Sequence, residues 1–407
     1  MKRVRTLVAA TAAGVLAAMA TFIVHAALLD FTPDERAAII GHGPWPPPLV
    51  NDPSNRVSGN IEAGALGQRL FFDGRLSSTG RVACVSCHMP PMLFAERRKT
   101  SVGVEAVDRN APSVVNARFQ RWFGWDGGSD SLWAHSLRPV LDPREHGFTI
   151  DRTAALISTD DELACRYRKV FGRDASSVAA ETVAVDAAKA IAAFQETLVS
   201  QRTRFDAFRD AIAAGDDAAA ARYPDNAQRG LRIFVGKGNC STCHIGALFS
   251  NREFADVGIP FFIAPGKVDN GRHGGIVRVK SDRLNQLGPH NDDPARAKGV
   301  ATRHVELQPK NYGEWKVPGL RNVAHTGPYM HNGSIETLRE VVVRYSDLDL
   351  ERLHADGERI LKPLKLSAAE IDDLVAFLES LTSPAPGLMI DLLPTQHARE
   401  LCVSRLN

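Results

Sequence analysis

The chain has 407 residues, of which 44% are hydrophobic and 24% are charged, and its formal net charge is +2. This composition is that of a globular protein with length for two or three domains. The near balance of charge gives no reason to expect a nucleic-acid partner, and short basic runs such as 97–99 are typical of solvated surface.

The N-terminus begins Met1-Lys2-Arg3-Val4-Arg5 and continues with an uncharged stretch from Leu7 to Val24. A basic start, an apolar stretch and small residues near Ala26 are typical of an export signal. An uncleaved membrane anchor is the alternative, because the stretch barely spans a bilayer, but its alanines and threonines favour cleavage. We therefore expect residues 1–26 to be a signal peptide or membrane anchor and the folded part to lie in the periplasm, either released or tethered to the membrane.

A C-x-x-C-H pattern occurs twice in the chain. It places these residues together: Cys84, Cys87 and His88 in the first copy, and Cys240, Cys243 and His244 in the second. At this spacing two thiols bond covalently to a haem and the histidine becomes its proximal iron ligand. Redox or zinc C-x-x-C sites would require two coincidences among only six cysteines. The sequence thus predicts two covalently bound haem c groups.

The two other cysteines are Cys165 and Cys402. An exported protein reaches an oxidising compartment, where two cysteines can form a disulfide. Nothing in the sequence indicates that these two meet in space. We therefore favour two separate thiols.

Several elements precede the second haem motif. Residues 44–48 are rich in proline and predict an irregular segment. Apolar residues at helical spacing predict a helix from about 176 to 200. The polar, alanine-rich stretch 203–221 is typical of an inter-domain connection, and a further helix is expected from about 226 to 235.

In the C-terminal third, the residues predict a long loop followed by two helices. Residues 259–314 are rich in Gly, Pro, Asn and Asp and predict a long loop. A helix-like stretch covers 338–345. Ser367 and Glu370 form a capping box that starts a last helix, and Pro384 is expected to stop it. Since strand signals are sparse, the fold is predicted to be mainly α, with one haem motif in each half.

The chemistry at each iron depends on the axial position opposite the proximal histidine. A methionine or histidine there makes an electron-transfer centre, whereas an open position can bind peroxide. For the second haem, Met330, His331 and Tyr345 are all conceivable ligands from their spacing. The sequence pattern alone leaves the choice open.

The chain resembles the bacterial diheme cytochrome c peroxidase family, in particular its MauG-like branch, over about residues 66–383. Besides the haem motifs, the resemblance is carried by Leu70-Phe71-Phe72-Asp73, Thr100-Ser101-Val102-Gly103, Arg109-Asn110-Ala111-Pro112, Trp125-Asp126-Gly127 and the segment 320–333. It implies two cytochrome c-like haem domains packed together. We place the N-terminal domain, which holds the peroxide-reactive haem, at 27–205. The C-terminal domain, which holds the electron-transfer haem, covers 206–385, and a tail covers 386–407.

The resemblance also implies roles for residues beside the first haem. Glu145 matches the distal acid, where a carboxylate can move a proton between the peroxide oxygens. Trp125 matches a tryptophan between the haems. His135 stands where the family has a polar distal-pocket residue, and His146 is a further histidine near this acid. Either histidine could instead be structural.

A calcium site between the domains is a further implication. Asn110, Thr326 and Pro328 match its ligands, and amide and carbonyl oxygens suit a hard cation. The three residues would be a weak signal without the resemblance.

Two departures decide the sub-type within the family. Conventional members follow the T-S-V-G run with a histidine that caps the peroxide haem, whereas this chain has Val104. At the position of Tyr345, conventional members have a methionine that binds the iron, whereas the MauG-like branch has a tyrosine that binds it. A phenolate favours the higher oxidation states of iron, so we favour Tyr345 over Met330 as the ligand. One feature restrains the MauG-like assignment: Gly238 replaces the surface tryptophan through which MauG oxidises its partner protein, so that route is not expected here.

These features predict a periplasmic diheme oxidoreductase that reacts with hydrogen peroxide and stores oxidising equivalents on two haems. A conventional diheme cytochrome c peroxidase, which draws electrons from a small c-type cytochrome, is the first alternative. A non-catalytic diheme electron carrier is the second, and Val104 and Glu145 argue against it. The final electron donor or protein substrate is not encoded in these motifs.

Overall fold

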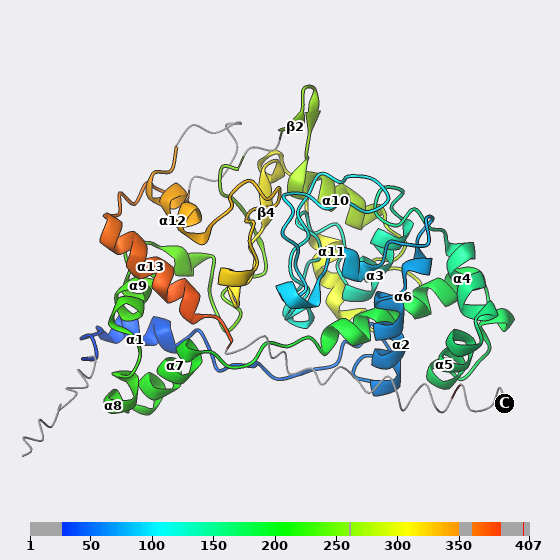
Figure 1. Cartoon of the computed structure of the whole chain (residues 1–407), viewed down its shortest axis with the longest axis horizontal. Helices are drawn as coiled ribbons and strands as arrows, with labels where there is room; N and C mark the ends of the chain where they lie inside the picture. Colours follow the sequence, from blue (N-terminus) through cyan, green and yellow to red (C-terminus); the bar gives the residue numbers. More distant parts are fainter. Residues whose placement is uncertain (1–26, 260–261, 350–359, 384–401, 403–407) are drawn as a thin grey trace, which may run out of the picture.

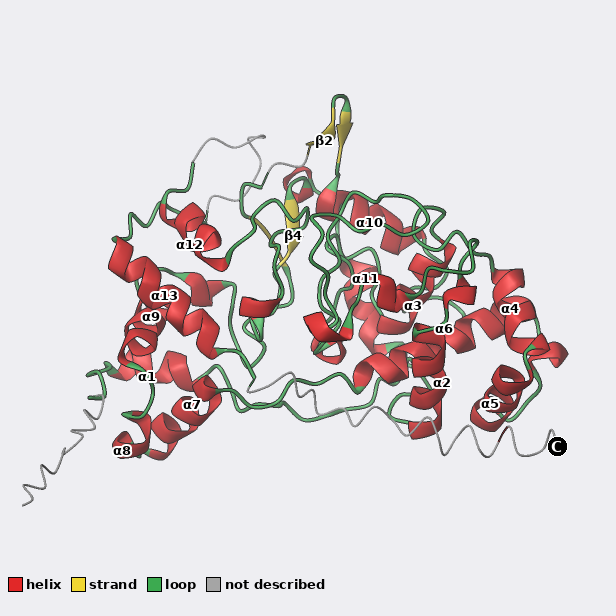
Figure 2. Ribbon diagram, in the orientation of Figure 1, coloured by secondary structure: helices red, strands yellow, loops and turns green. Residues whose placement is uncertain are grey.

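The computed structural model describes residues 27–259, 262–349, 360–383 and Cys402. The predicted leader, Pro384 and the predicted tail apart from Cys402 lie outside the described residues. Helices dominate and strands are short (Figure 2), so the mainly α prediction is confirmed. Within the described ranges, no helix has the length and apolar character needed to cross a membrane.

The elements follow one another in the order shown in Figure 1. The helices are α1 (Pro33–Ile40), α2 (Ile61–Phe71), α3 (Leu132–Leu141), α4 (Ile150–Thr159), α5 (Asp161–Phe171), α6 (Ala180–Glu196), α7 (Arg204–Ala214), α8 (Asp217–Ala220), α9 (Asp225–Val235), α10 (Gly271–Ser281), α11 (Val300–His304), α12 (Leu338–Ser346) and α13 (Ala368–Ser380). The strands are β1 (Phe254–Asp256), β2 (Phe262–Ala264), β3 (Lys267–Val268) and β4 (Glu314–Lys316). β1 pairs antiparallel with β4, and β2 with β3.

The first lobe is built from α2 to α6 around one apolar core (Figure 1). The predicted helix at about 176–200 is α6, and it packs against α2, α3 and α4. Its many alanines let these helices approach closely, and its long apolar side chains, such as Phe194, are fully buried. This core supports the segment that carries the first haem motif.

The second lobe contains α1, α7, α8, α9, α12 and α13 around a separate core. The predicted helices at 226–235 and 338–345 are α9 and α12, and α13 begins with the predicted Ser367–Glu370 capping box. The prediction of a connection over 203–221 is wrong. This segment forms α7 and α8, and Phe205 and Phe208 are buried in the core.

The N-terminal segment packs on the second lobe, although the predicted boundaries assign it to the first domain. α1 contacts α7 and α9, and Phe31 and Ile39 belong to the second core. The chain then crosses to the first lobe through the irregular proline-rich segment. The Trp45 indole donates to the Ser200 carbonyl at 2.9 Å, so the outgoing and returning segments lie side by side.

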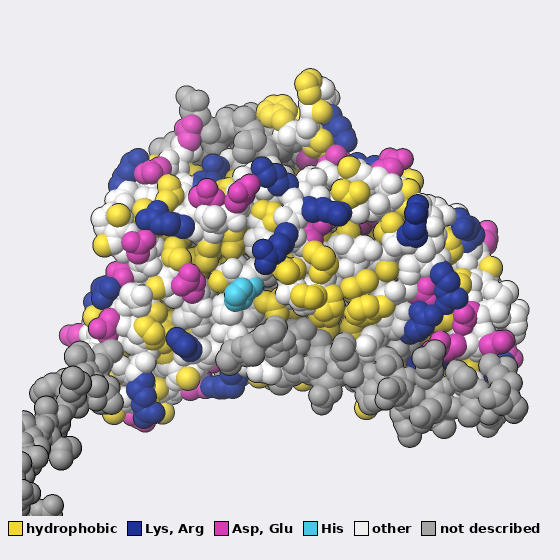
Figure 3. Space-filling model, viewed as in Figure 1, with side chains coloured by type: hydrophobic (Ala, Val, Ile, Leu, Met, Phe, Trp, Pro, Cys, Tyr) yellow, Lys and Arg dark blue, Asp and Glu magenta, His cyan; other side chains and the backbone are white. Residues whose placement is uncertain are grey.

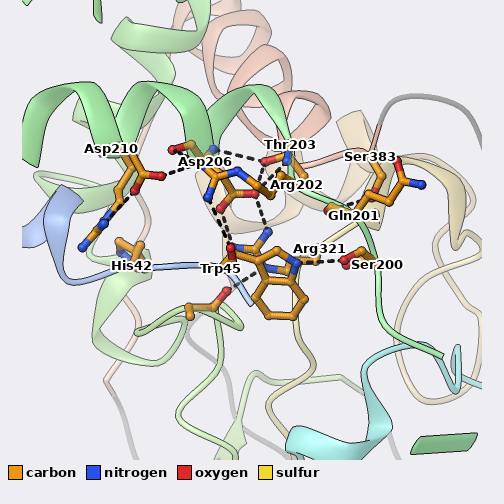
Figure 4. A network of polar contacts seen from close by, with 12 residues as sticks. His42, Trp45, Ser200, Gln201, Arg202, Thr203, Asp206, Asp210, Arg321 and Ser383 are labelled. Carbon is orange, nitrogen blue, oxygen red and sulfur yellow. Dashed lines mark hydrogen bonds and ion pairs between the residues drawn. The ribbon is translucent and has the colours of Figure 1, made fainter. Parts of the chain in front are cut away.

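A buried ion pair fixes this crossing to the second lobe (Figure 4). Arg321 donates two hydrogen bonds to the Asp206 carboxylate, at 2.8 and 2.9 Å, and a third to the Ala247 carbonyl. Its guanidinium also lies 3.7 Å from the centre of the Trp45 ring. The side chains of Arg321 and Asp206 are only 1% and 2% exposed.

The segment 259–314 is not a long loop, which corrects the sequence prediction. It contains the hairpin β2–β3, α10 and α11, and its many glycines and prolines concealed these elements. Asp292 pairs with Lys189 of α6 at 2.6 Å, and Gln286 donates to Asp130 at 2.9 Å. This segment of the C-terminal half therefore packs on the first lobe.

Cys165 of α5 forms a disulfide with Cys402, so the expectation of two separate thiols is wrong. The two residues are 237 positions apart. Such a long separation explains why no local pattern could indicate the pairing. The bond ties Cys402 to the first lobe.

We expect Asp206→Ala to lower the free energy of unfolding by about 3–5 kcal/mol, because it leaves the buried Arg321 guanidinium without its carboxylate. Asp210→Ala is the matched control. Asp210 pairs with Arg202 and Arg209 but is 36% exposed, so its loss should cost about 1 kcal/mol or less. Denaturant unfolding of the haem-loaded proteins measures both, and equal effects would contradict a central role for the buried pair.

Candidate active site

The first C-x-x-C-H motif opens onto a cavity of about 420 Å³. Cys84, Cys87 and His88 line it together, as covalent haem attachment requires. The Nδ1 atom of His88 lies 3.1 Å from the Phe94 carbonyl oxygen, which can only accept. Nδ1 therefore carries the proton, and Nε2 is left for the iron.

The second motif repeats this arrangement in a cavity of about 530 Å³. Cys240, Cys243 and His244 line it, and His244 donates from Nδ1 to the Phe249 carbonyl at 2.9 Å. Burial lowers the pKa of both motif histidines, which keeps each imidazole neutral and able to bind a metal. The two sites thus fit one haem c each.

Glu145 lines the first cavity, on the loop that follows α3. Burial raises the pKa of its carboxyl, although nearby Arg138 opposes the shift. The T-S-V-G loop fixes the backbone of this residue, because the Val104 amide donates to the Glu145 carbonyl at 2.8 Å. A Cβ at Gly103 would lie 2.2 Å from the same carbonyl oxygen, so only glycine permits this approach. Gly103 lines the cavity and Val104 does not.

His135 also lines the first cavity, one face of which is formed by α3. Its Nδ1 is buried and has no hydrogen-bond partner among the described residues. Burial, with the charges of Arg138 and Lys316 nearby, holds the pKa of His135 well below its usual value. It therefore presents a neutral imidazole to the cavity. His146 lines the cavity as well, but its Nδ1 is bound to the Leu76 carbonyl at 2.8 Å.

Trp125 lines both cavities. Its indole donates to the Asn110 carbonyl at 2.9 Å, and its own carbonyl accepts from the Lys316 amide at 2.9 Å. The structure therefore places this tryptophan in the wall between the two haem sites. An indole at this place can relay an electron, and the same contacts hold it rigidly.

The next residue, Asp126, was not singled out from the sequence. Its side chain is 1% exposed and binds Arg109 at 2.7 Å and Arg278 at 2.8 Å. Burial alone would raise the pKa of Asp126, but these guanidinium groups outweigh it and hold the pKa well below its usual range. A Cβ at Gly275 of α10 would lie 1.9 Å from the Asp126 carbonyl oxygen. Only the fold could reveal this cluster, because Arg278 comes from the segment interpreted as a loop.

Tyr345 of α12 lines the second cavity together with Met330. Burial, together with the nearby cysteines of the second motif, raises the pKa of the Tyr345 phenol to about 12. Both candidate ligands thus lie at this site. His331 lines it too, but its ring is stacked on Trp315 with the ring centres 3.5 Å apart.

The three residues of the predicted calcium site, Asn110, Thr326 and Pro328, line the second cavity. Asn110 comes from the first lobe, and its amide N–H donates to the His331 carbonyl at 2.8 Å. The fold therefore places these residues, from distant parts of the chain, in the lining of one cavity.

Comparison with known proteins agrees with this geometry. A family model described as di-haem cytochrome c peroxidase matches residues 62–213. The methylamine utilization protein MauG of Methylorubrum extorquens is 31% identical over 82% of this chain and 82% of its own length. The cytochrome-c peroxidase IdrP1 of Denitromonas iodatirespirans is 33% identical over 84% of this chain and 87% of its own length. The chain belongs to the di-haem cytochrome c peroxidase family.

Membership makes the protein a diheme oxidoreductase, as predicted from the motifs. Among solved structures, the diheme peroxidase BthA from Burkholderia thailandensis has a TM-score of 0.62 and 22% identity, covering 84% of this chain and 91% of its own. A MauG-like protein associated with microbial copper homeostasis has a TM-score of 0.64 and 24% identity, covering 86% of this chain and 98% of its own. These likenesses show a shared fold.

We expect Glu145→Gln to slow the reaction with hydrogen peroxide about a hundredfold or more, because an amide cannot accept the proton. In the wild type the carboxylate is the accepting form. Burial raises the pKa of Glu145. The loss of rate on acidification should therefore begin at a higher pH than it would for an exposed glutamate. Stopped-flow mixing across pH measures this, and a wild-type pH profile in the variant would contradict the assignment.

Proposed function

We propose that this family member is a periplasmic, MauG-like enzyme that reacts with hydrogen peroxide while both haems are ferric. The observation that carries the proposal is the side chain of Tyr345, which lines the second haem cavity with His244. The replacement of the capping histidine by Val104 supports it independently. The basic, apolar N-terminus supports export, with or without a remaining membrane tether.

At the first site a bound haem supplies an iron that can bind and cleave peroxide. Glu145 accepts a proton from the inner oxygen and returns it to the departing one, and its raised pKa suits both steps. His135, neutral and with a free Nδ1 among the described groups, is a second acceptor on the same cavity.

No ligating side chain from the T-S-V-G loop blocks this site. The loop is fixed by two backbone hydrogen bonds to the Glu145 loop, at 2.8 Å from the Val104 amide and 2.9 Å from the Glu105 amide. Access of peroxide therefore needs no reductive release of this loop. This is the physical basis for reaction in the ferric state.

At the second site Tyr345 is the proposed axial ligand. A phenol with a pKa of about 12 loses its proton readily only beside a strong positive charge, which a ferric iron provides. The resulting phenolate favours high oxidation states. Trp125, in the wall of both cavities, is the proposed path by which the two sites share oxidising equivalents.

The partner that is finally oxidised is proposed only by class: a small c-type cytochrome or another redox protein. The family as a whole implies peroxide and a redox partner. Because Gly238 stands just before the second motif, a partner cannot be oxidised through a tryptophan at that position.

Peroxide titration of the fully ferric protein tests the proposal. We expect the absorption spectrum to change on mixing without any reductant. A response only after reduction would assign the conventional peroxidase instead. Electron paramagnetic resonance provides the second readout, and the absence of a high-spin ferric signal would indicate an electron carrier.

We expect Tyr345→Met to raise the reduction potential of the second haem and to suppress the reaction of the ferric protein, because a thioether favours the ferrous state. Tyr329→Phe is the control, since Tyr329 also lines this cavity but donates its hydroxyl to the Val323 carbonyl. Spectroelectrochemistry measures both. An unchanged axial ligation in Tyr345→Met would assign the ligand to Met330.

Calcium is proposed to bind at Asn110, Thr326 and Pro328. Chelation should weaken the hydrogen bond between Trp125 and the Asn110 carbonyl, and thus slow the spectral response to peroxide. Re-addition of Ca²⁺ should restore it, while Mg²⁺, with its stricter geometry, should not. Metal analysis showing no calcium in the purified protein would contradict this assignment.

A further inference from the structure

Lys316 lies at the end of β4, in the wall between the two haem sites. Seven residues line both cavities: Asn110, Pro112, Ser113, Val115, Gln120, Trp125 and Lys316. Lys316 is the charged member of this set, and the other six are neutral. Its position is fixed through the backbone, because its amide binds the Trp125 carbonyl and its strand pairs with β1 opposite Phe254.

The ammonium of Lys316 forms no ion pair with a carboxylate in the described part of the chain. The carboxylate whose charge acts on it is Asp126, which is already bound by Arg109 and Arg278. Burial lowers the pKa of Lys316 to about 8, and Asp126 only partly opposes this. A partly buried cation without an anion is costly, so the site is incomplete without an anionic ligand.

We propose that Lys316 binds propionate carboxylates of both haems from this shared wall and that its charge raises the reduction potential of each. A haem brings its own carboxylates into the cavity, which supplies the missing anion. Positive charge near an iron favours the ferrous state, which carries one positive charge fewer. The inference depends on two haems being bound and is independent of whether the enzyme is MauG-like or conventional.

The variants Lys316→Met and Lys316→Arg test this assignment through the midpoint potentials. We expect Lys316→Met to lower the potentials of both haems and Lys316→Arg to keep them near wild type. Lys267→Met is the matched control: Lys267 lines the first cavity only and pairs with Asp108 at 3.1 Å. It should leave the potential of the second haem unchanged.

Spectroelectrochemical titration gives the potentials, and the haem content must remain two per chain. If Lys316→Met does not fold, Lys316→Gln removes the charge with a polar side chain and is interpreted in the same way. A neutral variant that shifts neither potential, or shifts only one, overturns the proposal. Because no peroxide is used, this result is separate from the test of the proposed function.

Discussion

The buried carboxylate of Asp126 is the contact on which the arrangement of the two haem sites depends. It joins Arg109, from the segment after the first motif, to Arg278 of α10, and Arg109 reaches on to Asp269 at 2.6 Å. Removing either cation would leave charge uncompensated inside the protein, which typically costs several kcal/mol. Since Trp125 is the adjacent residue, the same cluster that holds α10 on the first lobe also fixes the indole between the cavities.

The lobes are held together by an exchange of segments as well as by this cluster. The N-terminal segment with α1 packs on the second lobe, while α10, α11 and Asp292 pack on the first. The N-terminal segment reaches the second haem site, because His42 stacks on Phe249, whose carbonyl holds His244. The segment that contains α10 also carries the hairpin β2–β3. This hairpin protrudes from the surface with apolar side chains at its tip (Figure 3). Lys267 of the hairpin lines the first cavity. Two independent connections of this kind resist relative motion of the lobes.

Local sequence patterns were sufficient to predict some elements of this structure. Other elements depend on contacts between distant residues, which local patterns do not record. The capping box at Ser367 and the apolar spacing of α6 depend on residues within a few positions, and both were predicted. α10 was not, because its glycines are poor helix formers, and one of them, Gly275, is needed for the close approach of the Asp126 carbonyl. The Cys165–Cys402 disulfide and the Asp126 cluster join residues far apart in the chain, which no periodicity can reveal. In the site, the motif residues and Glu145 were found by their spacing or resemblance, whereas Lys316 became visible only when two cavities were seen to share a wall.

The sides of the two sites that carry the motif histidines are nearly identical, so the sites differ in the other residues that line each cavity. Each motif histidine donates to the carbonyl of a phenylalanine five or six residues later, and each is buried and neutral. The first cavity is also lined by a carboxyl of raised pKa and by an imidazole whose Nδ1 has no partner among the described residues, and both groups can handle protons. Across the second stands a phenol that can bind metal once its proton is displaced. In the proposed function, one repeated motif serves proton-coupled chemistry in the first lobe and charge storage in the second. Trp125, which lines both cavities, is the proposed connection between them.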